Sequence, residues 1–99
     1  MLKNVEVLIV EDSPTQAMVL DDMLRGHGYR TAIARNAHDA LEHLKQHLPT
    51  LVISDIVMPG VDGYELCRRI KADARTRRVP VVLLTHLTGP EDIVRGLEC

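Results

Sequence analysis

The chain alternates short runs of β-branched and other apolar residues with segments that have a helical period. Four such runs lie at residues 5–10, 30–34, 51–54 and 79–84, each bounded by turn or capping residues. They predict buried strands. Because strands that alternate with helices pair in parallel through right-handed crossovers, and because nearly continuous apolar strands need helices on both faces, we expect an α/β fold with a doubly wound parallel sheet.

The segments between the runs carry the apolar stripes and the end signals of helices. In the first segment Val19 and Met23 fall on the same side as two leucines, so we expect this side to pack against the sheet. In the second segment Leu48 extends a similar stripe up to Pro49. The expected helices begin near residues 14, 36, 62 and 90, and the expected caps of the first three are Ser13, Asn36 and Asp62.

The length and the charge of the chain limit its organisation and its partners. Ninety-nine residues are enough for one domain, which we expect to span residues 1–99. A net charge of −2 with mixed signs gives no field that would gather a nucleic acid or an anionic membrane, so neither is an expected partner. The apolar run at residues 7–10 is far shorter than a membrane span or a signal-peptide core, and we expect a cytoplasmic protein.

Polar side chains follow three of the expected strands. Glu11 and Asp12 come after the first strand, Asp55 after the third and Thr85 after the fourth. Ligands of open parallel sheets bind beyond the carboxyl ends of the strands, so these four residues are expected to converge. A single Asp in such a place is usually a cap or turn residue, but other residues are available here as caps. Clustered carboxylates repel one another, which favours a site for a hard cation such as Mg²⁺.

Three segments together resemble the receiver domain of two-component response regulators. They are VLIVEDS at residues 7–13, LVISDIVMPGVDGYELCRRI at 51–70 and VPVVLLTHLTGPEDIVRGLE at 79–98. The resemblance extends over essentially the whole chain and implies a flavodoxin-like sheet with strand order 2-1-3-4. In that family a fifth strand, with a lysine at its start, and a fifth helix follow. The chain stops at Cys99 before both, so we expect a receiver domain that is incomplete at its C-terminal end.

The resemblance also implies roles for the residues at the strand ends. Asp55 would accept a phosphoryl group from a phosphohistidine of a histidine kinase or of a histidine phosphotransfer protein. Glu11, Asp12 and Asp55 would hold Mg²⁺ together with the backbone carbonyl of Val57, and Thr85 would donate its hydroxyl to the phosphoryl group as a switch. Such a domain is not an enzyme with a separate substrate, although it assists its own phosphorylation and dephosphorylation.

The outer face of the first helix is the expected contact surface for the phosphodonor. Pro14, Thr15 and Met18 lie on this face, away from the apolar stripe of the helix. In receiver domains the corresponding face docks on the helical bundle of the kinase. The resemblance therefore implies that these three residues contact the partner protein.

Two other functions remain as alternatives. Without a fifth strand, the run at residues 79–84 becomes an apolar edge, which we expect to be covered in a longer natural chain or, as the second possibility, by a homodimer or strand exchange through this fourth strand. The alternative function is therefore a receiver-like dimerisation or scaffold module that is not phosphorylated. A metal-dependent hydrolase on the same fold is disfavoured, because Val57 stands where a second Asp would act as acid and base.

His43 and His47 form one further pattern, outside the acidic residues. Their spacing of four residues is that of zinc ligands on one helix face. However, the two residues flank the apolar stripe of the second helix, and no third ligand is evident in the sequence. We therefore interpret them as solvated helix residues.

Overall fold

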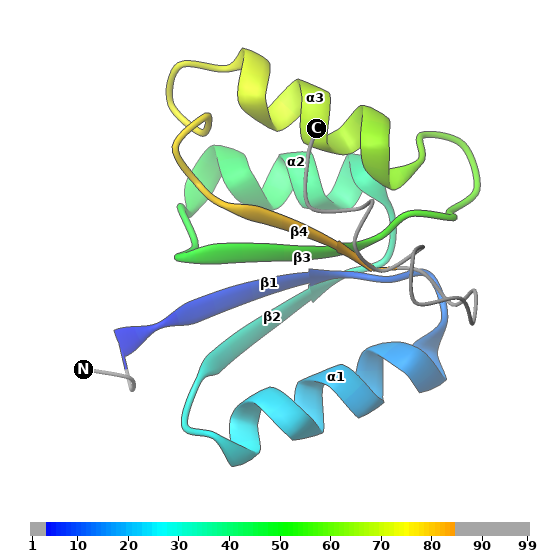
Figure 1. Ribbon diagram of the computed structural model, residues 1–99, viewed down its shortest axis with the longest axis vertical. Coiled ribbons are helices and arrows are strands. Elements are labelled where there is room, and N and C mark those ends of the chain that lie inside the picture. Colours follow the sequence, from blue (N-terminus) through cyan, green and yellow to red (C-terminus); the bar gives the residue numbers. More distant parts are fainter. Residues whose placement is uncertain (1–3, 85–99) are drawn as a thin grey trace.

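The computed structural model describes residues 4–84, which form a doubly wound α/β fold (Figure 1). The four strands are all parallel and lie in the order β2-β1-β3-β4, so the predicted fold class and strand order are confirmed. The predicted fourth helix lies outside the described residues. The strands are β1 (Glu6–Val10), β2 (Arg30–Ala34), β3 (Leu51–Asp55) and β4 (Val81–Leu84), and the helices are α1 (Pro14–Gly26), α2 (Ala37–Gln46) and α3 (Gly63–Ala72).

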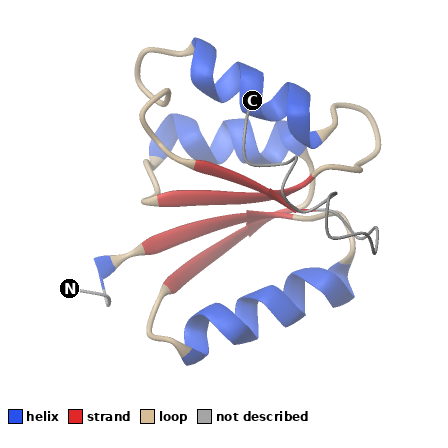
Figure 2. Cartoon of the chain, viewed as in Figure 1, coloured by secondary structure: helices blue, strands red, loops and turns tan. Residues whose placement is uncertain are grey.

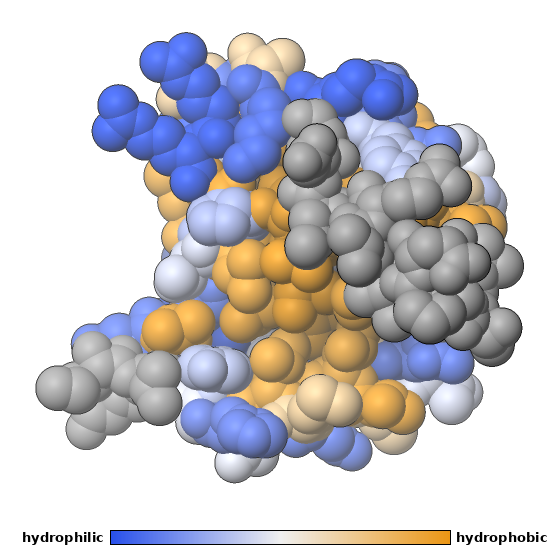
Figure 3. All heavy atoms as spheres, viewed as in Figure 1, coloured by the Kyte–Doolittle hydropathy of each residue, from blue (hydrophilic) through white to orange (hydrophobic). Residues whose placement is uncertain are grey.

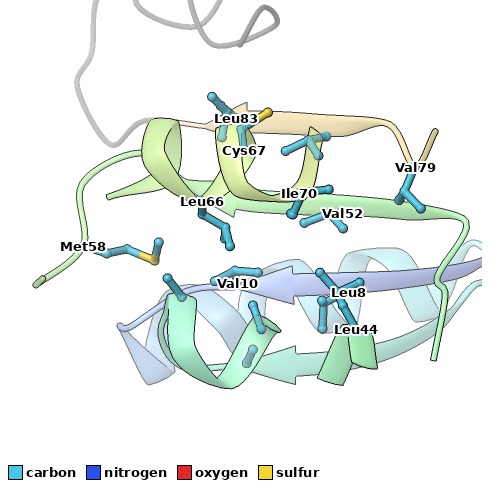
Figure 4. Packing of buried hydrophobic residues seen from close by; sticks show 14 residues of the cluster. Leu8, Val10, Leu44, Val52, Met58, Leu66, Cys67, Ile70, Val79 and Leu83 are labelled. Atoms are coloured by element: carbon cyan, nitrogen blue, oxygen red, sulfur yellow. The ribbon is translucent and has the colours of Figure 1, made fainter. Parts of the chain in front are cut away.

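The main core lies between the sheet and the layer formed by α2 and α3 (Figure 2). Leu8 of β1, Val52 of β3 and Leu83 of β4 point into this layer, where they meet Leu44 of α2 and Ile70 of α3 (Figure 4). All five side chains are at most 1% exposed. The buried residues of this cluster include no aromatic ring, in a chain that has no Trp and no Phe, and the partly buried Tyr64 packs against them.

Each of the three helices in residues 4–84 begins directly after its predicted cap. In every case the side-chain oxygen of the cap accepts a hydrogen bond from the backbone N–H three residues later, which satisfies a donor that the first turn would otherwise leave unpaired. The three bonds run from Gln16 N to Ser13 Oγ (3.3 Å), from Asp39 N to Asn36 Oδ1 (2.8 Å) and from Glu65 N to Asp62 Oδ1 (2.9 Å).

Three residues that were expected to be buried are exposed. Val19 and Met23 are 53% and 55% exposed, because α1 is the only helix among residues 4–84 on its side of the sheet. Leu48 is 51% exposed because α2 ends at Gln46, two residues earlier than predicted. The backbone of His47 is extended, with φ −142° and ψ 133°, and this turns the following residue away from the helix face.

Strand β4 is an edge strand within the described part of the chain. It begins at Val81, two residues later than predicted, because Pro80 has no N–H to donate. The carbonyl of Pro80 still accepts a bond of 3.0 Å from Val52 N. Figure 3 shows apolar side chains across the middle of this view, between α1 and the layer of α2 and α3. In β4, Val82 and Leu84 are only half-buried. No helix in residues 4–84 has the length and hydrophobicity that a membrane span requires.

The two sides of the sheet differ in how deeply their helices bury apolar side chains, so substitutions on the two sides should differ in their effect on the free energy of unfolding. Ile70→Ala removes a side chain that is 0% exposed, and we expect it to lower the free energy of unfolding by about 2–5 kcal/mol. Met23→Ala removes a side chain that is 55% exposed and should change it by less than about 1 kcal/mol. Urea denaturation followed by far-UV circular dichroism checks both values. Equal losses would show that Met23 is buried in solution.

Candidate functional site

Three carboxylates meet at the carboxyl end of the sheet. Glu11, Asp12 and Asp55 each offer an oxygen, and these oxygens all lie within 4.8 Å of one another. The register explains the meeting, because Val10 of β1 pairs with Ser54 of β3 and the next residue of each strand is acidic. Thr85, the fourth residue that the sequence assigns to this edge, lies outside the described residues.

Two hydrogen bonds hold Glu11 in place, one through its backbone and one through its side chain. Its backbone N–H donates to Ala34 O of β2 at 3.0 Å, and its Oε2 accepts from Ser13 N at 3.1 Å. The side chain is 3% exposed, whereas the neighbouring Asp12 is exposed. One carboxylate of the acidic pair is thus fixed inside the protein, and the other faces solvent.

Asp55 is the last residue of β3 and is 4% exposed. Its Oδ1 lies 3.4 Å from Val57 N, a long hydrogen bond. The following residue is tied to β4 by a bond of 2.8 Å from Ile56 N to Leu84 O. Val57 is 64% exposed, so the chain emerges from the protein within two residues of the carboxylate.

The first residue of α3 lies directly against the backbone of Asp55. Gly63 N donates to Ile56 O at 2.8 Å, and a Cβ at Gly63 would lie only 2.3 Å from Asp55 O. No residue other than glycine fits there without a shift of the backbone. The sequence interpretation did not identify this contact. The signal for it was the glycine directly after the cap Asp62, a position where most helices have a residue of higher helix propensity.

The cluster brings like charges together in a partly buried place. At 4.8 Å, two full negative charges repel by about 3 kcal/mol if the effective dielectric constant is about 20. A cation bound between the carboxylates removes this repulsion. Because all the donors are carboxylate oxygens, the cluster fits a hard divalent ion such as Mg²⁺ better than a softer metal.

A cavity of about 210 Å³ extends from the acidic pair along α1. Two of the three expected partner residues, Pro14 and Met18, line it, and Met18 is 64% exposed. Thr15 is exposed beside them but does not line the cavity. The other lining residues are Glu11, Asp12, Ala17, Asp21, Ile33 and Arg35.

Comparison with protein families gives one match that covers nearly all of the chain. The family model of the response regulator receiver domain matches residues 7–99. Response regulator PleD of Caulobacter vibrioides is 36% identical over 95 residues, which are 96% of this chain and 21% of PleD. Protein PilH of Pseudomonas aeruginosa is 39% identical over 90 residues, which are 91% of this chain and 74% of PilH. The chain therefore spans about a fifth of PleD but most of PilH.

Solved structures show the same similarity. The receiver domain of a signal transduction histidine kinase from Syntrophus aciditrophicus has 50% sequence identity and a TM-score of 0.83, over 96% of this chain and 72% of that one. The N-terminal domain of a response regulator receiver protein from Methanoculleus marisnigri has 39% identity and a TM-score of 0.83, over 93% and 76%. Both similarities include the fold and the sequence.

The contact between Gly63 and Asp55 predicts an unusual response to Gly→Ala substitution. In an open helix position this change stabilises by about 1 kcal/mol. At Gly63 the new Cβ meets Asp55 O, so we expect Gly63→Ala to destabilise by about 1–3 kcal/mol. Gly26→Ala at the end of α1 is the matched control, because its Cβ would meet nothing within 4 Å. Urea denaturation of both variants tests the contact, and a stabilised Gly63→Ala variant would disprove it.

Proposed function

Because the chain belongs to the response regulator receiver domain family, we propose that it accepts a phosphoryl group on Asp55 in a two-component phosphorelay. The observation that carries this proposal is the meeting of three carboxylates within 4.8 Å at the carboxyl end of the sheet. Asp55 is the one of the three that ends a central strand, with its backbone fixed by β4 and α3. A nucleophile held in this way keeps a constant position relative to the two carboxylates of β1.

The proposed reaction moves one phosphoryl group from nitrogen to oxygen. A carboxylate oxygen of Asp55 attacks the phosphorus of a phosphohistidine on a histidine kinase or a histidine phosphotransfer protein. The P–O bond forms as the P–N bond breaks, and the electron pair of that bond leaves with the imidazole nitrogen. The products are an acyl phosphate on Asp55 and the free histidine of the donor.

The other residues of the edge have supporting roles in this proposal. Glu11, Asp12, Asp55 and the backbone carbonyl of Val57 would hold Mg²⁺, which when bound supplies positive charge beside the transferring group. Thr85 follows the last residue of β4, and we assign it the hydroxyl that contacts the phosphoryl oxygen after transfer. The new contact of the Thr85 hydroxyl would transmit phosphorylation of Asp55 to the surface of the domain.

We propose that the phosphodonor docks on the outer face of α1. Pro14, Thr15 and Met18 lie there, and the cavity beside them reaches Glu11 and Asp12. A donor on this surface would bring its phosphohistidine to the acidic cluster without crossing the face of the sheet that α2 and α3 cover. We place the domain in the cytoplasm and assign it no direct contact with a nucleic acid or a membrane.

One structural feature favours the alternative function. Strand β4 is an apolar edge strand within residues 4–84, and Val82 and Leu84 are half-buried there. Such an edge pairs readily with another chain. In the alternative, β4 forms a homodimer or exchanges strands, and the domain serves as a scaffold without being phosphorylated.

Intact mass spectrometry after incubation with a small acyl phosphate tests the proposal. We expect a gain of one phosphoryl group that requires Mg²⁺ and is absent from Asp55→Asn. Asp12→Asn should reduce the gain because it removes an exposed carboxylate of the cluster while leaving Asp55 intact. A gain that persists in Asp55→Asn would place the modification elsewhere. No gain in the unaltered chain would favour the scaffold function, which size-exclusion chromatography with light scattering would then examine.

A second experiment tests the docking surface. Met18→Ala should slow transfer from a phosphorylated protein donor about fivefold or more, because it removes an exposed apolar anchor, but leave transfer from a small acyl phosphate unchanged. Met23→Ala is the matched control, since this residue is also about half exposed on α1 but does not line the cavity. If Met18→Ala slowed both reactions equally, the residue would act on the acidic cluster and not on docking.

A further inference from the structure

His43 and His47 lie side by side at the end of α2. The final helical hydrogen bond, from His47 N to His43 O at 3.0 Å, keeps the two residues one turn apart. Their ring centroids are 5.6 Å apart, with the rings edge to face at 75°. This end of α2 leads into the start of β3. The pair therefore lies near the amino ends of the strands, whereas the acidic cluster lies at their carboxyl ends (Figure 1).

Each of the two rings has one nitrogen atom to which no hydrogen bond is assigned among residues 4–84, namely Nε2 of His47 and Nε2 of His43. His47 Nδ1 is 3.2 Å from Gln46 O, and because a carbonyl only accepts, Nδ1 carries the proton and a neutral ring keeps the lone pair on Nε2. Histidines that bind metals commonly have this second bond to a carbonyl. His43 Nε2 is buried and has no hydrogen-bond partner among the described residues. The interpretation of His43 as solvated was therefore wrong, since the residue is half-buried.

A buried nitrogen without a partner requires an explanation, and an ion or a water molecule is the usual one. Here His43 and His47 line a cavity of about 450 Å³ with Glu42 and Gln46. That volume holds an ion with several water molecules. Glu42 Oε2 forms an ion pair of 2.9 Å with Lys45 Nζ, and the hydrogen bond and charge of Lys45 lower the pKa of the Glu42 carboxyl group.

We propose that His43 and His47 bind a divalent transition-metal ion of the Zn²⁺ or Ni²⁺ type, with water completing the coordination. Imidazole nitrogen suits these ions and suits Mg²⁺ poorly, so this site and the acidic cluster select different metals. Binding requires the His43 ring to turn until its Nε2 leaves its buried position and faces Nε2 of His47, whose ring keeps its contact with Gln46 O. The needed rotation is about the Cβ–Cγ bond, a soft torsion for histidine.

Isothermal titration calorimetry with Zn²⁺ tests the proposal in the 99-residue chain, with excess Mg²⁺ present to occupy the acidic cluster. We expect one Zn²⁺ per chain and at least about tenfold weaker binding in His47→Gln and in His43→Gln. His38→Gln is the matched control, because His38 is an exposed histidine on the same helix outside the cavity, and its binding should stay within about twofold of the unaltered chain. Equal binding by all four proteins, or none by the unaltered chain, would overturn the proposal.

Nuclear magnetic resonance separates loss of the site from loss of the fold. In the unaltered chain, Zn²⁺ should shift the ring signals of His43 and His47 and leave those of His27 and His38 in place. His47 is exposed, so His47→Gln should keep the backbone spectrum of the folded protein. Shifts at His27 or His38 in place of the pair would also overturn the proposal. None of these outcomes depends on whether Asp55 is phosphorylated, so the two proposals can fail separately.

Discussion

The pairing of β1 with β3 is the constraint on which the rest of this structure depends. The two strands run parallel with Val10 opposite Ser54, so Glu11 and Asp55 leave the sheet at the same level. Because side chains alternate along a strand, a slip by one residue would turn every apolar side chain of β1 to the other face and separate the carboxylates. The same register that buries Leu8 and Val52 in the core therefore also assembles the acidic cluster.

The cluster is unfavourable for folding and is sustained by its surroundings. Glu11 and Asp55 are almost fully buried beside a third carboxylate, in a small domain whose buried core residues include no aromatic ring. The free energy that offsets the repulsion comes from the layer of α2 and α3, where side chains such as Leu66 and Ile70 are completely buried. Local conflict of this kind is expected at functional sites, where the needs of chemistry and of stability differ.

The sequence predicted those features that depend on local pattern. The strands, the three caps and the meeting of Glu11, Asp12 and Asp55 all follow from periodicity and from the rule for open parallel sheets. The exposure of Met23 was not predicted, because an apolar stripe does not show whether a second helix lies beside it.

Two other features depend on the arrangement in space, which a pattern of residue types does not contain. The contact of Gly63 with Asp55 O brings together residues from different elements. The unpartnered nitrogen of His43 depends on the packing around one atom. The glycine after the cap Asp62 was a signal for the first feature, but it did not say which atom Gly63 contacts, and the second feature had no signal in the sequence.

The contact at Gly63 has a consequence for how a change at Asp55 spreads through the domain. The main chain of Asp55 and Ile56 is held by α3 on one side and by β4 on the other. This part of the main chain is therefore held rigidly, and a new charge on the Asp55 side chain would not readily displace strand β3. The segment that follows is less restricted, because Val57 is exposed to solvent. Under the proposed function, a phosphoryl group on Asp55 would therefore change the exposed segment at Val57 more than the backbone that α3 holds.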